Sequence, residues 1–571
     1  MCFIIVKMSL RINSNFNLET NNKIFWEDYY MRSKIRSLNT NSMRKLDMSL
    51  YVKNLFVVFW LVFFLFGFSF TAAAADSSQV LNEVKNDIKN HYVDNIPDGV
   101  LNASSIDEAL KKLNDPYTEY FSKEEETNFL NSINNKIYGI GIYMSQVPSG
   151  IKIDSVVANS PAENVGLKEG DIIISANSHS LANITFDQAS SYIKGDENTN
   201  VNLVIQRQDK VLSFSVKRGE VSIPIVDGKM LDSGTAYIHI ASFGEDTSQK
   251  FNEKLKELQV NKPARYIIDL RDNGGGYMDS ALNVAGNFIG QNLALIVEDK
   301  NDKKTGYLAG EEQDIIDKPT IFLVDKYTAS ASEILSAAVK DYKKAFFIGN
   351  TTYGKGVAQQ MFDLSDGGAL KLTVEKFYSP AGNTIQKVGI KPDFDTGNEN
   401  SLAAAQLLSG QCKNGTDKRG FLKATINNEK FYIDLSIAKN EEYWSAFKYI
   451  VSNIDRSQIW IGTKDGWAKV PEEYFSNIYK FFYPEDKVLD TMQQVSQNKA
   501  FTVIFNKKIG SDIKDKVNME IINGTTGKRV AFKIGSVEDN KVVIVPQEKL
   551  EKGKTYYIKV KDTIKPVTVK N

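Results

Sequence analysis

Short apolar runs alternate with helical segments between residues 219 and 395, and this alternation constrains the fold more than any other feature of the sequence. The runs contain few polar residues, which is typical of strands that are buried on both faces of a largely parallel sheet. Helices between such strands cover the faces of the sheet. The pattern therefore predicts an α/β layer with the strands TAYIHIASF (235–243), ARYIIDLR (264–271), TIFLVD (320–325) and AFFIG (345–349).

Different patterns flank this layer. Residues 136–218 hold five short β runs and two short helical segments, which predicts one compact module. Residues 484–571 hold at least five β runs separated by turns, which predicts a small all-β sandwich. Residues 76–135 are predicted to be helical, and residues 396–483 mix both patterns and are left as an unassigned α/β segment. The predicted fold class is therefore a multidomain chain with α/β and α+β parts.

An uncharged apolar stretch runs from Leu55 to Phe70, after basic residues and before the small-residue run TAAAAD (71–76). This order predicts that residues 43–75 form a secretory signal peptide. The alternative is a permanent membrane anchor, although the stretch is shorter than the ~20 residues that span a bilayer. Either way, we expect the rest of the chain outside the cytoplasm, secreted or membrane-anchored at the cell envelope. Residues 1–42 are predicted either to be disordered or to result from a start codon that was assigned too far upstream.

The composition argues against several classes of function. The 70 basic and 70 acidic residues leave no net charge, so no basic excess exists to bind nucleic acid. Cys2 and Cys412 lie far apart, and the three histidines lie on separate segments. Neither a disulfide framework nor a cysteine- or histidine-based metal site is therefore expected. We expect no metal, no cofactor and no nucleic-acid partner.

Ser330 opens a helix directly after a predicted buried strand. The tetrapeptide Ser330-Ala331-Ser332-Glu333 favours a capping box, in which the serine hydroxyl caps the amide of Glu333. The alternative is a nucleophile at the positive end of the helix, where the amide of Ala331 is free to stabilise an oxyanion. His239 alternates within a strand pattern and is better explained as a strand residue, so a Ser–His–Asp triad has weak support.

A second polar segment, GNTTYGKG (349–356), supplies a candidate base. A buried lysine whose pKa is lowered can deprotonate a serine, and Lys355 is available for this role. Gln359 lies four residues further on and can hold the amine by a hydrogen bond. One alternative is a solvated glycine turn. The other alternative is a nucleotide-binding P-loop. Gly356 argues against this interpretation, because a P-loop has Ser or Thr at this position to bind magnesium.

Two glycine-containing segments are ambiguous by themselves. The run DLRDNGGG (269–276) lets a backbone amide approach a substrate closely, or it is a loop that needs positive φ angles. The run YGIGI suits the capture of a peptide C-terminal carboxylate and β-strand addition, or it is a glycine-bulged edge strand. Its residues are Tyr138, Gly139, Ile140, Gly141 and Ile142.

Taken together, the motifs resemble the carboxyl-terminal processing peptidases, which are PDZ-containing serine endopeptidases with a Ser–Lys pair. The resemblance covers roughly residues 77–395. It rests on TASASE (328–333), YGKGVAQ (353–359), DLRDNGGG (269–276), SPAENVGLKEGDIIISAN (160–177), DPYTEYF (115–121) and GNTIQKVGIKPD (382–393). It implies a PDZ domain at 136–218 and a ClpP/crotonase-like α/β protease core at 219–395. The tail, through FTVIFNKKI (501–509) and GKTYYIKV (553–560), resembles bacterial Ig-like domains.

The resemblance also implies roles for individual residues. It makes Ser330 the nucleophile, Lys355 the general base and Gln359 the residue that orients the base. It assigns the oxyanion hole to the amides of Gly275 and Ala331. It places the peptide-binding groove of the PDZ domain at residues 138–142. The family usually has Pro where this chain has Gly274.

The implied function is an extracytoplasmic serine endopeptidase that captures protein C-termini with its PDZ domain. Ser330 would cleave the peptide bond through an acyl-enzyme, and activity would rise with pH as the lysine loses its proton. The expected substrates are unfolded or extended protein C-termini. An activating envelope partner, a latent resting state and a homodimer through residues 76–135 are further expectations from the family. The alternative function is a catalytically inactive cell-envelope peptide-binding protein on the same scaffold.

Overall fold

The computed structural model describes residues 76–134, 136–195, 197–222, 224–312, 314–412, 414–506 and 519–571. The predicted signal peptide and the segment before it lie outside the described residues. Within these ranges, no helix combines the length and the apolar character needed to cross a membrane.

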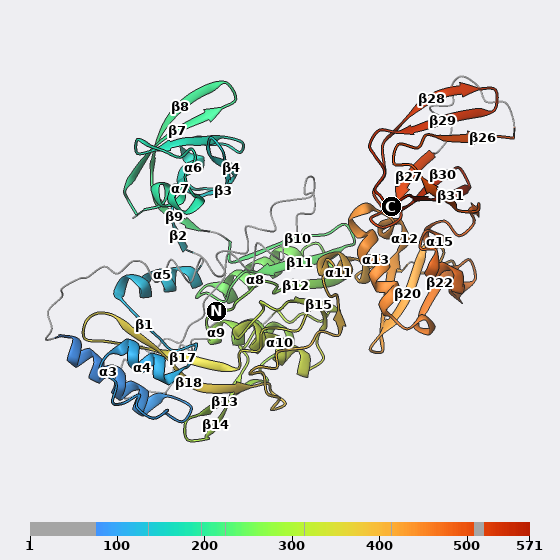
Figure 1. Cartoon of the computed structure of the whole chain (residues 1–571). Helices are drawn as coiled ribbons and strands as arrows, with labels where there is room; N and C mark the ends of the chain where they lie inside the picture. The colour runs from blue at the N-terminus through green and yellow to red at the C-terminus, as the bar shows by residue number, and fades with distance from the viewer. Residues whose placement is uncertain are drawn as a thin grey trace.

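A six-stranded sheet forms the centre of the molecule (Figure 1). Its order is β10-β11-β12-β15-β16-β19, and all neighbours are parallel except β10 and β11. Within this sheet the strands lie side by side in chain order. The strands are β10 (Val226–Met230), β11 (Thr235–Ile240), β12 (Arg265–Asp269), β15 (Thr320–Val324), β16 (Phe346–Gly349) and β19 (Phe394–Asp395).

Both faces of this sheet are buried, each in its own apolar core. One face packs in the core that contains α8 (Thr247–Gln259), α9 (Met278–Ile289) and α10 (Ala331–Asp341). The other face packs in the core that contains α11 (Ser401–Leu408). Adjacent residues of β12 show the division, because Ile268 belongs to the first core and Ile267 to the second. The loops at the carboxyl ends of the strands are therefore attached to a layer that is buried on both faces.

A second sheet joins the N-terminal helical region to the central layer. Its order is β1-β18-β13-β14, with β17 also paired to β18. Because β1 comes from the N-terminal region, that region shares one apolar core with the central layer. The elements are α3 (Asp76–His91), α4 (Ile106–Leu113), β1 (Glu119–Phe121), α5 (Lys123–Ile133), β13 (Leu293–Asp299), β14 (Lys304–Leu308), β17 (Val357–Asp363) and β18 (Ala369–Tyr378).

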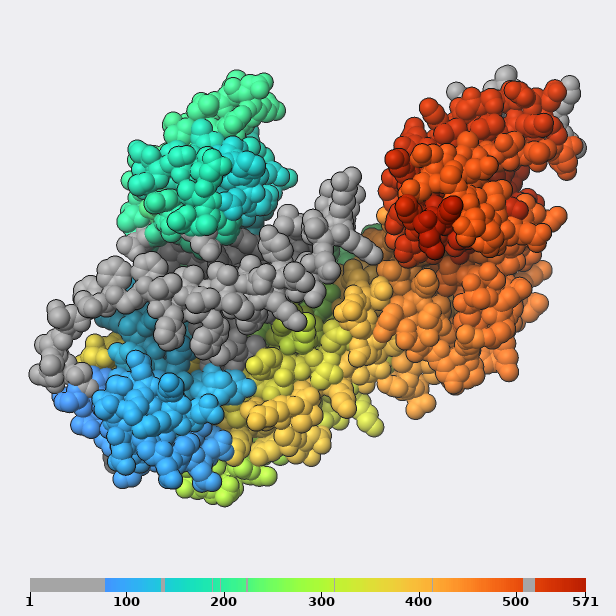
Figure 2. All heavy atoms as spheres, in the orientation of Figure 1, coloured from blue at the N-terminus to red at the C-terminus, as the bar shows by residue number. Residues whose placement is uncertain are grey.

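The module between α5 and β10 has its own core and stands apart from the central layer (Figures 1 and 2). Its sheet order is β3-β4-β5-β7-β8, with β6 paired to β5, so β3 is an edge strand. The antiparallel pair β2–β9 connects the module to the rest of the chain. The elements are β2 (Lys136–Gly139), β3 (Ile142–Val147), β4 (Gly150–Val156), α6 (Pro161–Asn164), β5 (Ile172–Ala176), β6 (His179–Ser180), α7 (Phe186–Ile193), β7 (Asn200–Arg207), β8 (Lys210–Lys217) and β9 (Gly219–Ser222).

The segment that the sequence left unassigned covers the second face of the central sheet. Its four-stranded antiparallel sheet has the order β21-β20-β22-β23 and packs with α11 and α13 in the second core. Besides α11, the elements are β20 (Phe421–Ile426), β21 (Glu429–Asp434), α12 (Leu435–Ala438), α13 (Glu441–Asn453), a 3₁₀ turn (Arg456–Gln458), β22 (Ile459–Thr463), β23 (Gly466–Lys469), α14 (Glu472–Ser476) and α15 (Tyr479–Phe482).

The chain ends in two sheets that share a separate apolar core, which is the predicted small sandwich. One sheet has the order β24-β31-β30-β27, with β25 paired to β31, and the other has the order β26-β29-β28. The strands are β24 (Lys487–Val488), β25 (Met492–Val495), β26 (Phe501–Ile504), β27 (Met519–Asn523), β28 (Phe532–Glu538), β29 (Lys541–Pro546), β30 (Thr555–Val560) and β31 (Thr563–Val569).

Candidate active site

Ser330 stands at the start of α10 in a strained conformation. Its φ of 57° and ψ of −109° lie outside the regions that residues with a Cβ adopt readily. The side chain is fully buried, and among the described residues its Oγ has no hydrogen-bond partner. Backbone strain of this kind costs about 1–3 kcal/mol, and an unsatisfied buried hydroxyl costs a similar amount. No contact of the Ser330 side chain offsets these two costs, which marks Ser330 as a functional candidate.

The capping-box arrangement of Ser330 and Glu333 expected at this helix is present. The carboxylate of Glu333 accepts from the backbone N–H of Ser330, at 2.6 Å between N and Oε2. The hydroxyl of Ser330 makes no side-chain capping bond. The capping box favoured by the tetrapeptide is therefore present as an arrangement, but no hydrogen bond holds the Ser330 hydroxyl in it. The hydroxyl is left available for another role.

Glu333 is the centre of a buried network that the sequence did not reveal. Its Oε2 also accepts from the backbone N–H of Lys355 at 2.8 Å. Its Oε1 accepts from the hydroxyl of Thr352 at 2.5 Å and from the N–H of Gly354 at 2.7 Å. Burial raises the pKa of Glu333 to about 7, against the opposite effect of these four donors. One carboxylate therefore ties the backbone of Ser330 to the loop that carries Lys355.

Lys355 and Gln359 lie together in the interior, both fully buried. The Nζ of Lys355 donates to Oε1 of Gln359 at 2.6 Å. It also lies 4.9 Å from the centre of the Tyr117 ring. Lys355 belongs to the loop between β16 and β17, and Gln359 lies on β17. The structure thus brings Ser330, Lys355 and Gln359 into one region, although Ser330 Oγ and Lys355 Nζ form no hydrogen bond.

The glycine-rich turn after β12 packs against the start of α10. The backbone carbonyl of Asn273 accepts from the N–H of Ala329 at 3.1 Å and from Oγ of Ser332 at 3.0 Å. The side chain of Asn273 accepts from the N–H of Gly275 at 2.7 Å. The amide of Gly275 is therefore engaged within the turn. As the first residue of α10, Ala331 has an amide that no carbonyl of its own helix can accept.

The five residues of the predicted peptide-binding segment are divided between three places. Tyr138 and Gly139 pair with β9, and Ile142 begins the edge strand β3. Between them, the carbonyl of Ile140 accepts from the N–H of Ala162 in α6 at 2.7 Å. Gly141 has a φ of 79°, and a Cβ there would lie 2.2 Å from the Cβ of Ser160. The segment therefore turns tightly beside the exposed hydrogen-bonding edge of β3.

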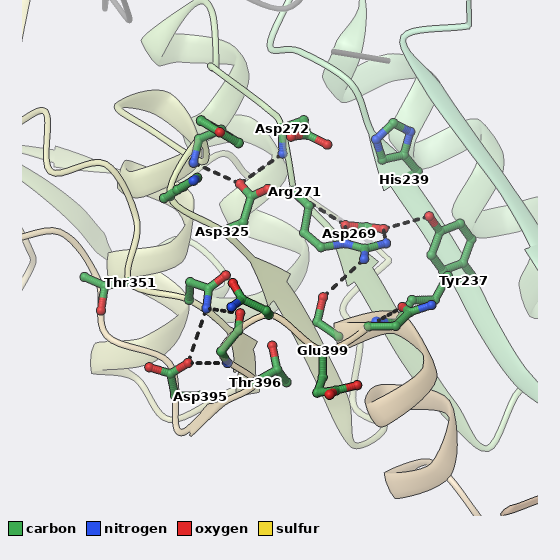
Figure 3. Close-up of a pocket in the computed structure, with 18 residues that line it drawn as sticks. Tyr237, His239, Asp269, Arg271, Asp272, Asp325, Thr351, Asp395, Thr396 and Glu399 are labelled. Carbon is green, nitrogen blue, oxygen red and sulfur yellow. Dashed lines mark hydrogen bonds and ion pairs between the residues drawn. The ribbon is translucent and has the colours of Figure 1, made fainter. Parts of the chain in front are cut away.

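A polar cavity of about 1060 Å³ opens at the carboxyl ends of the parallel strands, and Figure 3 shows its lining. Arg271 Nε donates to Asp269 Oδ1 at 2.7 Å, and Tyr237 donates to the other oxygen of Asp269 at 2.8 Å. His239 lines this cavity, whereas Ser330 and Lys355 do not. Among the described residues, no group of three or more metal-ligating side chains is found.

Comparison with known families matches three parts of the chain. Residues 152–207 match the PDZ domain, residues 234–396 match peptidase family S41, and residues 487–571 match the bacterial Ig-like domain. Together with the buried serine and lysine, these matches define an S41-type serine peptidase that carries a PDZ module and an Ig-like module.

Similarity to individual proteins makes the assignment more specific. The chain is 34% identical over 345 residues to the carboxy-terminal processing protease CtpB of Bacillus subtilis (strain 168), which covers 59% of this chain and 70% of that protein. It is 34% identical over 304 residues to CtpA of the same organism, with 53% and 65% covered. The solved photosystem II D1 C-terminal processing protease has a TM-score of 0.38 and 22% identity, with 57% and 94% covered. The chain belongs to the carboxy-terminal processing protease family.

This membership confirms the family, the enzyme class and the multidomain fold class expected from the sequence. Sequence reasoning missed Glu333 as a link between Ser330 and Lys355. The S-x-x-E spacing suggests only a contact within one helix, and nothing in the local pattern indicates that the same carboxylate reaches the loop at 352–355.

Proposed function

We propose that the chain is an extracytoplasmic serine endopeptidase in which Ser330 is the nucleophile, Lys355 the general base and Gln359 the residue that orients the base. The observation that carries the proposal is the Glu333 carboxylate, whose Oε2 accepts from the backbone N–H groups of both Ser330 and Lys355. A buried group that fixes a strained serine beside a buried lysine supports a nucleophile–base pair. The extracytoplasmic location rests on the sequence between residues 43 and 76.

The proposed reaction uses the lysine as a neutral amine. Lys355 Nζ takes the hydroxyl proton as Ser330 Oγ attacks the carbonyl carbon of the scissile peptide bond. The resulting ammonium returns the proton to the leaving amine, and an acyl-enzyme remains. Lys355 then deprotonates a water molecule that hydrolyses the ester and frees Ser330. The amide of Ala331, at the positive end of α10, is aimed to stabilise the oxyanion of both tetrahedral intermediates.

The structure favours a resting state for this site rather than an assembled one. Ser330 Oγ has no hydrogen bond to a base, and the amide of Gly275 is occupied by Asn273. Gly275 can act as the second oxyanion donor only after the Asn273 side chain releases it. We therefore propose that substrate or an envelope partner moves the 273–276 turn and brings the Lys355 amine to Ser330.

Cleavage of an unfolded protein with an apolar C-terminal tail by the purified chain tests this function. We expect cleavage that persists with a chelator and rises from about pH 6 to about pH 9, because the base must lose a proton. A rate that does not change with pH, or that requires a metal, contradicts the lysine mechanism. Binding of the tail without cleavage, with or without added envelope extract, supports the alternative of an inactive peptide-binding protein.

Capture of the substrate C-terminus is tested at Gly141. Gly141→Ala places a Cβ against Ser160 and should distort the turn beside β3, raising KM for the tailed substrate roughly tenfold, which corresponds to about 1.4 kcal/mol of binding. The matched control is Gly170→Ala, whose φ of 86° is similar but whose Cβ meets nothing within 4 Å. Equal KM values for the two variants would argue against a binding role for residues 138–142.

A further inference from the structure

The segment Asp115–Thr118, between α4 and β1, contacts strand β18 behind the candidate base. The hydroxyls of Thr118 and Thr373 both donate to Oδ2 of Asp115, each at 2.6 Å. The backbone N–H of Thr373 donates to the hydroxyl oxygen of Thr118 at 3.2 Å. Thr118 and Thr373 are buried, while Asp115 is partly exposed at the edge of the core. The N-terminal region thus presents one carboxylate to the interior.

A chain of hydrogen bonds runs from this carboxylate to the candidate base. Thr373 lies opposite Gln359 in the β17–β18 pair. Gln359 Nε2 donates to the hydroxyl oxygen of Thr373 at 3.2 Å, and Gln359 Oε1 accepts from Lys355 Nζ at 2.6 Å. Asp115 is therefore connected to Lys355 through Thr373 and Gln359, across 240 positions of sequence between Asp115 and Lys355.

The directions of these bonds determine which end of the Gln359 amide faces the lysine. A hydroxyl has one proton, and Thr373 gives its proton to Asp115, because an ionised carboxylate only accepts. The hydroxyl oxygen can then only accept from Gln359, so the amide NH₂ points to Thr373 and the amide oxygen points to Lys355. With this orientation, the N–H groups of the amine donate to Gln359 and its lone pair stays available for a proton.

The opposite orientation of Gln359 would disable the base. Its NH₂ group would face Lys355 and donate to the lone pair of the neutral amine, which the reaction requires. It would also repel the ammonium form, because both groups carry only N–H donors. An unconstrained glutamine can adopt either orientation, so the site needs a group that selects one.

We propose that Asp115 and Thr373 are positioning residues that fix the amide of Gln359 and thereby keep Lys355 competent as a base. This inference rests on the Ser–Lys mechanism proposed above. It gives the N-terminal region a function in catalysis, because that region supplies the carboxylate. Among the described residues, the titratable and charged groups around this chain of bonds include Tyr92, Asp94, Tyr117 and Asp115 from the N-terminal region and Glu333 from α10.

Thr373→Val in the full chain tests the proposal, because valine keeps the shape of threonine and removes the hydroxyl. We expect kcat to fall at least tenfold with KM unchanged. We also expect the acidic limb of the pH–rate profile to move about one unit toward lower pH, because a flipped amide stabilises the neutral amine. Thr373→Ser should restore both quantities. In Asp115→Asn the amide oxygen stays toward the N–H of Tyr117, so the NH₂ group faces Thr373 and cannot accept its proton; this variant should move the profile in the same direction.

The matched control is Thr320→Val, which removes a buried strand hydroxyl that donates to the carbonyl of Lys318, away from the base. It should leave the pH–rate profile in place. A wild-type profile for both Thr373→Val and Asp115→Asn, with Lys355→Ala inactive, overturns the positioning role and leaves the Ser–Lys mechanism intact. Full activity of Lys355→Ala would instead overturn the mechanism itself. If Thr373→Val does not fold, the pH–rate profile of Asp115→Asn tests the positioning role instead. This variant is expected to fold, because Asp115 lies at the edge of the core.

Discussion

Ser330→Ala is expected to lower kcat/KM for a tailed, unfolded substrate by at least about 10³-fold without lowering the stability of the fold. The activity falls because no other group takes over as nucleophile. The stability is retained because Ser330 Oγ has no hydrogen-bond partner among the described residues, so its removal breaks no bond. The measurements are the rate of substrate cleavage and the thermal unfolding midpoint of the same preparation.

Ser332→Ala is the matched control for this experiment. Ser332 lies two positions further on, is equally buried, and donates its hydroxyl to the carbonyl of Asn273 at 3.0 Å. Its loss should cost about 1 kcal/mol of stability and leave kcat/KM within tenfold of the wild type. The two serines are thus expected to respond in opposite ways, one in activity and the other in stability. Equal cleavage by Ser330→Ala and the wild type would exclude Ser330 as the nucleophile.

The α/β layer and the small sandwich could be predicted from the sequence because both depend on local patterns. Continuous apolar runs such as TIFLVD predict β15, and the strands of the central sheet lie side by side in chain order. Residues 396–483 could not be assigned, because their helices and strands complete a core whose other half belongs to the central sheet. Their apolar residues can be assigned to a core only when the position of the central sheet is known.

The candidate site could be predicted only where the chemistry lies in short motifs. Ser330, Lys355 and Gln359 could be proposed as site residues because each lies in a recognisable segment. The link through Glu333 was missed because the same S-x-x-E spacing also describes an ordinary capping box. The contact of Asp115 with Thr373 joins positions 258 residues apart. A hydrogen bond of this kind leaves no periodic signal in a single sequence, so only the structure reveals it.

Glu333→Ala is expected to have the largest effect on both stability and activity. It leaves four buried donors without an acceptor: the hydroxyl of Thr352 and the N–H groups of Ser330, Gly354 and Lys355. Each costs about 1–3 kcal/mol, so we expect a loss of at least about 4 kcal/mol in the free energy of unfolding. Any folded fraction should be inactive, because Ser330 and Lys355 lose their shared anchor. Urea unfolding and cleavage rates measure the two effects.

Glu333→Gln separates the charge of this group from its shape. Glutamine keeps one oxygen acceptor but turns an NH₂ group toward two of the four donors, so we expect at least a tenfold loss of activity at pH 8. A folded-state pKa of about 7, raised from 4.5, means that the stabilising contribution of Glu333 is fully present below about pH 4.5 and is lost as the pH rises through 7.

The neutral amide of Glu333→Gln cannot make this pH-dependent contribution. The free energy of unfolding of the wild type, measured by urea unfolding from about pH 5 to about pH 8, should therefore fall by up to about 3 kcal/mol relative to the variant. Activity should follow the opposite trend, because the donors on both oxygens require the ionised carboxylate. A constant difference in stability between the two proteins across this range would show that Glu333 stays ionised and acts only as an acceptor. The pH range that favours the ionised carboxylate, and with it the Ser330–Lys355 geometry, is thus expected to be the range in which the fold is less stable than at lower pH.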